Sequence, residues 1–153
     1  MSNIRDFGAK GDGRSDDTDA VQHAIEASGG FVEFPPGDYL ITRTVMLNLP
    51  MSGRTGLTGS AGAAKVIMAG AGAAFHFVGS HGGTAQPEDF HADVWRRERM
   101  PTILNLEIEG RHPLADGILL EGTMQSTFEG LLLRELRHGI RIHGRARNVL
   151  VSH

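Results

Sequence analysis

Two short segments carry the side chains whose types and spacing are best suited to chemistry. They read DGILLEG (116–122) and HGIRIHG (138–144), and their alignment places Glu121 beside His143. Such an arrangement suits an acidic sugar, because an arginine can hold a uronate carboxylate while a histidine or arginine moves a proton. The candidate catalytic residues are therefore Arg141, His143 and Glu121, and the candidate substrate-binding residue of this region is Arg137.

The same pair has a simpler interpretation. Glu121 and His143 can be an exposed cross-strand pair that contributes a few tenths of a kcal/mol, about what such surface pairs give. The residues alone leave both interpretations open.

A repeat indicates which elements must position these residues. The two segments are offset by 22 residues, from Gly117 to Gly139. NLEIEG from Asn105 aligns with GLLLRE from Gly130 and with NVLVSH from Asn148. A period near 22 with two or three short strands in each period is typical of a solenoid. We therefore predict a parallel β-helix, whose coils stack about 4.8 Å apart.

Strand alternation then sorts the side chains into inward and outward sets. Outward residues are Glu121 and His143, side by side, and in the neighbouring strand Glu107, Leu132 and Leu150, in that order along the stack. The residues predicted to be buried are Ile118, Leu120, Ile140, Ile142, Leu131, Leu133, Val149 and Val151.

The N-terminal segment NIRDFGAKGDGRSDDTDAVQHAI predicts a helix start and not a phosphate or calcium loop. It lacks the Gly-Lys-Ser/Thr of a P-loop and the alternating carboxylates of an EF-hand. Asp16 or Asp17 can accept hydrogen bonds from the first turn of a helix over 16–27. Its apolar face is Ala20, Val21, Ala24 and Ile25.

This segment also carries a resemblance to a known family. NIRDFGAKGDGRSDDTDAVQHAIEAS followed by GG and FVEFPPGDYLI resembles the N-terminal signature of the pectate-lyase-like superfamily. The resemblance implies a right-handed parallel β-helix whose N-terminal end is plugged by this helix. It also implies membership among polysaccharide lyases, glycoside hydrolases, epimerases and phage tailspikes, but not which of them, since one scaffold carries many activities.

An insertion from Gly79 to Pro101 interrupts the coils. It contains the only tryptophan, Trp95, which we take as a second candidate for substrate binding because it can stack on a sugar ring; a partner protein is the alternative. Its His and Asp residues follow no fixed metal-ligand spacing, and we predict no metal site. We expect no cofactor; calcium is the one that the resemblance implies for the lyase type.

Composition limits the partners. The net charge is −3, so no basic field recruits nucleic acid, and no apolar run is long enough to span a membrane. The chain has no cysteine and no signal-peptide pattern, and the resemblance implies an extracellular or periplasmic location. We expect a polysaccharide as the partner.

The sequence stops within a predicted strand, RNVLVSH, with no capping element after it. We therefore expect residues 1–153 to be the N-terminal part of one longer β-helix domain, inactive alone. We also expect a homo-oligomer, formed through the open C-terminal coil or through Leu132 and Leu150. Two functions remain: a carbohydrate-active enzyme on an acidic polysaccharide, or a structural or adhesive solenoid such as a tailspike-like subunit.

Overall fold

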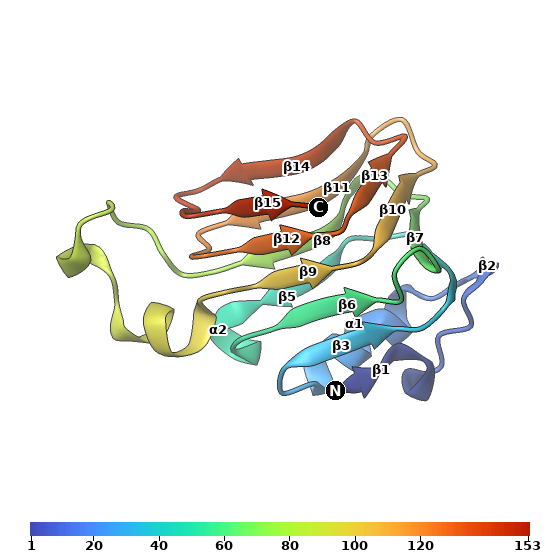
Figure 1. Cartoon of the computed structure of the whole chain (residues 1–153), viewed down its shortest axis with the longest axis horizontal. Helices are drawn as coiled ribbons and strands as arrows, with labels where there is room; N and C mark the ends of the chain where they lie inside the picture. The colour runs from blue at the N-terminus through green and yellow to red at the C-terminus, as the bar shows by residue number, and fades with distance from the viewer.

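The computed structural model of residues 1–153 is a right-handed parallel β-helix, as predicted. Three parallel sheets run along it, which we call A, B and C (Figure 1). Sheet A contains β1 (Ser2–Asn3), β3 (Phe31–Phe34), β6 (Gly56–Gly59), β9 (Thr102–Leu104), β12 (Thr127–Glu129) and β15 (Leu150–Ser152). Sheet B contains β2 (Asp12–Asp16), β4 (Gly37–Ile41), β7 (Ala64–Met68), β10 (Glu107–Gly110) and β13 (Leu132–Arg134). Sheet C contains β5 (Val45–Asn48), β8 (Gly72–Val78), β11 (Ala115–Glu121) and β14 (His138–His143).

Each coil takes one strand from sheet A, then B, then C, so side chains at matching positions stack from coil to coil. The interior is a single cluster of 26 buried apolar residues. Within it, Phe34 meets both Tyr39 and Phe75 edge to face, with ring centres 5.7 and 6.0 Å apart. This continuous core fixes which face of every strand points outward.

Helix α1 (Thr18–Ala27) closes the N-terminal end, with Val21, Ala24 and Ile25 buried against the first coils. Gln22 of this helix extends the hydrogen bonding of sheet C beyond its edge strand β5. Its side-chain amide accepts from the Met46 N–H (2.8 Å) and donates to the Met46 carbonyl (3.1 Å). The edge strand β5 therefore has part of its backbone paired by a helix side chain.

The helix begins two residues later than predicted. Asp16 ends β2, and its carboxylate accepts from the Thr18 N–H at 3.0 Å. The buried Asp17 carboxylate turns back instead and accepts from the N–H groups of Lys10 (2.7 Å) and Gly11 (2.9 Å). The acidic residues of the N-terminal signature thus hold the turn that joins the cap to the first coil.

The predicted register between 116–121 and 138–143 is confirmed, with Ile118 paired to Ile140 and Glu121 to His143. The pairing of Glu107 with Leu132 is confirmed as well. The alignment of NVLVSH with these strands is wrong, because Leu150 pairs with Thr127 in sheet A. Leu132 and Leu150 are both exposed, but they lie on different sheets and form no stack.

The error in alignment has a physical cause. A residue with positive φ precedes a short strand at two different turns of each coil: Asn105 and Gly130 lead into sheet B, and Gln125 and Asn148 lead into sheet A. The sequence signal is the same at both turns.

The predicted burial is right for Ile118 and Leu120 and wrong for Ile142 and Val151, which are 52% and 57% exposed. Strands β14 and β15 are the outermost strands of their sheets, so each inward side chain there is covered on one side only. Ile140, Leu131, Leu133 and Val149 are half-buried for the same reason.

A four-residue helix, α2 (Leu49–Ser52), follows β5. The 79–101 insertion lies between β8 and β9, and it projects from the edge where sheet C connects to sheet A (Figure 1). It contains a 3₁₀ turn (Pro87–Asp89) and a π-helical turn (Val94–Glu98). No helix is long and apolar enough to cross a membrane.

Candidate functional site

The outer face of sheet C brings the predicted site residues together in two rows. One row contains Met46, His76, Leu119 and Arg141, and the next contains Asn48, Val78, Glu121 and His143. The strand pairing that sequence alignment predicted therefore holds for the candidate catalytic residues.

The partner of Glu121, however, is His76. The Glu121 Oε2 atom lies 3.1 Å from His76 Nε2, whereas His143 is solvent-exposed on the other side of Glu121. A carboxylate bonded to one ring nitrogen fixes the orientation and tautomer of an imidazole. Glu121 thus positions His76 and leaves the imidazole of His143 open to a ligand.

A cluster of polar contacts next to these rows centres on the buried Asp116, at the start of β11. Its carboxylate accepts from Arg137 Nε (3.0 Å) and Nη2 (2.7 Å), from Arg141 Nη1 (3.3 Å), and lies 2.9 Å from His138 Nδ1. The Asp116 side chain is only 2% exposed. The hydrogen bonds from Arg137 hold the pKa of Asp116 well below its usual range, against the opposing effect of burial.

This arrangement divides the predicted arginines into two roles. Arg137 is bidentate to Asp116, so most of its fork is used inside the protein. Arg141 uses one nitrogen on Asp116 and keeps the rest of its five N–H donors available. Arg141 is therefore the better ligand for an incoming carboxylate, and Arg137 positions Asp116.

The charged residues of the C-terminal segment 136–153 are all basic. The residues from Leu136 to His153 include four arginines and three histidines but no aspartate or glutamate, although the whole chain has a net charge of −3. Such a local field attracts anionic ligands.

Sequence reasoning missed three residues of this face: Asp116, His138 and His76. The signal for two of them was present, since Asp116 and His138 open the two aligned segments and pair directly. His76 could not be found in the same way, because the long 79–101 insertion separates β8 from the regular repeat.

Trp95 lies in the insertion and not in the rows of sheet C. Its ring centre is 5.3 Å from that of Phe90, which in turn stacks on His81 at 4.4 Å. The buried Glu98 accepts from the Ser80 N–H and hydroxyl, both at 2.7 Å, and so fastens the two ends of the insertion. Trp95, 37% exposed, is presented by a fixed loop.

The residues present do not fit a calcium ion. No group of three or more His, Cys, Asp or Glu side chains could hold a metal. The buried carboxylate next to this face, Asp116, is already bonded to Arg137 and Arg141. Calcium requires several free oxygen ligands.

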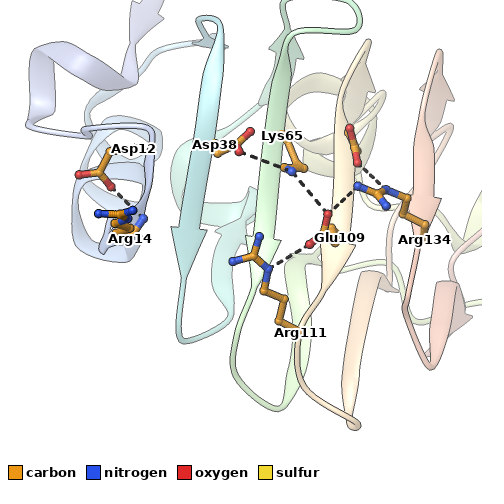
Figure 2. Close-up of polar contacts among 8 residues, drawn as sticks. Asp12, Arg14, Asp38, Lys65, Glu109, Arg111 and Arg134 are labelled. Carbon is orange, nitrogen blue, oxygen red and sulfur yellow. Dashed lines mark hydrogen bonds and ion pairs between the residues drawn. The ribbon is translucent and has the colours of Figure 1, made fainter.

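A second set of charged side chains covers the outer face of sheet B (Figure 2). They are paired with one another. Lys65 lies 3.5 Å from both Asp38 and Glu109, and Arg134 bonds Glu109 at 2.7 Å. Burial raises the pKa of Glu109, but the hydrogen bond from Arg111 and the neighbouring cations lower it further than burial raises it. Each of these charges already has a partner. The ion pairs therefore connect neighbouring coils and leave few free charged groups for a ligand.

Comparison with known proteins identifies the family. A family model described as rhamnogalacturonase A/epimerase, pectate lyase-like, matches residues 1–99, more than half of the chain. The chain belongs to this family.

Proteins similar to this chain include an alginate lyase and mannuronan epimerases. Alginate lyase 7 of Azotobacter vinelandii is 54% identical over 44 residues, which are 26% of this chain and 5% of that protein. The solved A-module of the mannuronan C-5 epimerase AlgE4 from the same organism has a TM-score of 0.70 at 22% identity, covering 98% of this chain and 43% of the module.

A solved surface protein and adhesin of Streptococcus pneumoniae, PfbA, has the same fold, with a TM-score of 0.62 at 20% identity over 98% of this chain and 39% of that one. The plasmin and fibronectin-binding protein A of Streptococcus pneumoniae is 47% identical over 49 residues, 29% of this chain and 7% of that protein. This chain therefore matches only a small part of the curated relatives. The structural likeness establishes the fold, and the reaction has to be argued from the site.

Proposed function

We propose that this chain belongs to a carbohydrate-active β-helix protein that binds an acidic polysaccharide on the outer face of sheet C. The observation that carries the proposal is the joint position of Arg141, held by Asp116, and His143, beside the Glu121–His76 pair. A cation and an imidazole on adjacent rows can engage the carboxylate and the neighbouring proton of one sugar.

The recognition step belongs to Arg141. Its free N–H donors match a uronate carboxylate, and the nearest acidic side chains, Asp116 and Glu121, are bonded to Arg137 and His76. Arg137 and His138 keep Asp116 ionised and fixed, so that Arg141 is preorganised.

The chemical step of a lyase is β-elimination. A base removes the proton on C5, next to the carboxylate, the C4–O bond breaks, a C4=C5 double bond forms, and the leaving oxygen takes up a proton. We assign the base role to the imidazole of His143 and the proton-donor role to the His76–Glu121 pair. Arg141 stabilises the negative charge that develops on the carboxylate.

The relatives named as an alginate lyase and a mannuronan epimerase support a uronate polymer as the ligand. The same relationships support an extracellular or periplasmic location, and the solved pneumococcal relative is described as a surface protein and adhesin. Self-association, through the last coil or through the exposed Leu132 and Leu150, stays a prediction.

The alternative function is a non-catalytic adhesive solenoid. The likeness to the plasmin and fibronectin-binding protein A supports it. The two functions differ in whether the sheet C face recognises uronates.

The experiment is calorimetric titration with trimannuronate. The wild-type chain is expected to bind, and Arg141→Ala is expected to lose at least about tenfold in affinity, as for a lost charge-assisted contact. Arg14→Ala is the matched control, since the exposed Arg14 lies on β2 of sheet B. Equal binding by both variants, or no binding by the wild type, would contradict the proposal.

A further inference from the structure

A pocket of about 380 Å³ lies next to the candidate site, between helix α1, strand β5 and helix α2. We call it the terminal pocket. Its lining includes Gln22, Glu26, Met46, Asn48, Met51 and Ser52. Its volume is large enough for one sugar residue.

The terminal pocket is continuous with the two rows of sheet C. Met46 is the direct strand neighbour of His76, and Asn48 that of Val78. Adjacent strands lie about 4.8 Å apart, close to the length of one pyranose residue. A polysaccharide that lies across the strands, with a carboxylate on Arg141 of β14, reaches β5 three strands later.

The walls of the terminal pocket are fixed. The Gln22 amide bonds the Met46 backbone at both ends and donates to Glu26 Oε1 at 3.0 Å. The Ser52 hydroxyl donates to the Asn48 carbonyl at 2.9 Å. Met46 and Met51 then expose apolar surface, 39% and 79% accessible, to which the flat face of a sugar ring can pack.

Charge decides which sugar fits. Glu26 is the one charged residue that lines the terminal pocket, whereas the opposite end of sheet C carries Arg137 and Arg141. A uronate carboxylate entering the pocket would meet a like charge and no cation. An uncharged sugar carries no charge for Glu26 to repel, and it can contact the methionines, the Asn48 amide and the Ser52 hydroxyl.

We propose that the terminal pocket binds an uncharged sugar residue at the end of the polysaccharide segment whose acidic residues lie on sheet C. This inference rests on the proposed function. It adds a specificity: the ligand is a mixed chain, acidic at the arginine end and neutral at the helix end.

The experiment compares four ligands of defined composition. They are trimannuronate, tetramannuronate, and two tetrasaccharides in which a neutral mannose extends trimannuronate at either end. One of the mixed tetrasaccharides is expected to bind about tenfold more tightly than trimannuronate, and tetramannuronate is expected to show no such gain. In methyl-labelled protein, the signals of Met46 and Met51 should move with that mixed ligand and not with trimannuronate.

Two isosteric variants isolate the charge. Glu26→Gln should increase the affinity for tetramannuronate several-fold and leave that for trimannuronate unchanged. Glu33→Gln, on the outer face of sheet A, should change neither. The inference is overturned if trimannuronate binds but neither extension strengthens binding and the two methionine signals stay in place. If trimannuronate itself does not bind, the proposed function fails and this inference with it.

Discussion

Asp116 and Arg137 form a bidentate ion pair between adjacent coils, with nitrogen–oxygen distances of 3.0 and 2.7 Å. The carboxylate is buried while the guanidinium is partly exposed, at 2% and 39% accessibility. The pair links the start of β11 to the turn before β14, and it fixes Arg141 on the same carboxylate. Structure and recognition therefore depend on one aspartate.

Asp116→Asn should lower the free energy of unfolding by about 1–3 kcal/mol, because it weakens hydrogen bonds to a buried carboxylate. Urea unfolding measures the change. Asp19→Asn is the control, since Asp19 and its partner Arg43 are both largely exposed and their pair should contribute under about 1 kcal/mol. Equal effects of the two substitutions would show that the Asp116 cluster does not stabilise the fold.

The same cluster predicts an acid dependence. The folded-state pKa of Asp116 is lowered by Arg137, so its contribution is complete above the unfolded value, near 3.8, and is lost as the pH falls through the folded-state value. The stability difference between the wild type and Asp116→Asn should therefore be constant from pH 7 to about 5 and shrink below about 4. A difference that grows on acidification would contradict this assignment.

The insertion should loosen at mildly acidic pH. Burial and then the charge of Arg147, with Arg145, lower the pKa of His81, against the opposing charge of Asp89. The neutral imidazole of His81 therefore stabilises the packed insertion at pH values above 6.5, the ordinary pKa of histidine. This stabilisation is lost as the pH falls below 6.5.

Limited proteolysis within 79–101 should be faster at pH 5.5 than at 7.5 in the wild type. His81→Phe, which keeps the stack on Phe90, should remove most of the difference. Cleavage that is independent of pH in the wild type would refute the role of His81.

Helix α1 should be essential to the first coils. Ile25→Asp should destabilise the chain by about 2–4 kcal/mol, because it buries an unpaired charge and loses apolar contact. Ala27→Asp, at the exposed last residue of the same helix, is the control and should cost under about 1 kcal/mol, the size of an acidic charge at a helix C-terminus. A melting temperature unaffected by Ile25→Asp would show that α1 is not a cap.

Much of the fold was predictable because each coil repeats the same physical requirement. Alternation of apolar residues identified the inward faces of β11 and β14, and the 22-residue offset gave their register. The exposure of Ile142 was not predictable from alternation, since it depends on whether another strand covers β14. The position of Leu150 was not either, because Gln125 and Asn148 adopt the same positive φ as the residues before sheet B strands.

The site was predictable only where it follows the repeat. Glu121, Arg141 and His143 lie in aligned segments, so their neighbourhood could be inferred. The preference of Glu121 for His76 depends on side-chain geometry across the insertion, which no local pattern records. Arg137 was predicted to bind substrate, but its guanidinium bonds the buried Asp116. This contact too depends on side-chain geometry.

Binding of a uronate on sheet C is tested most directly by NMR mapping of trimannuronate on the wild-type chain. Signals of His76, Glu121, Arg141 and His143 on sheet C are expected to move with added ligand. Signals of Lys65, Glu109 and Arg134 on sheet B should stay in place, since those side chains are already paired with one another. Shifts confined to sheet B or to the insertion, or no shifts at all, would contradict a uronate-binding face on sheet C.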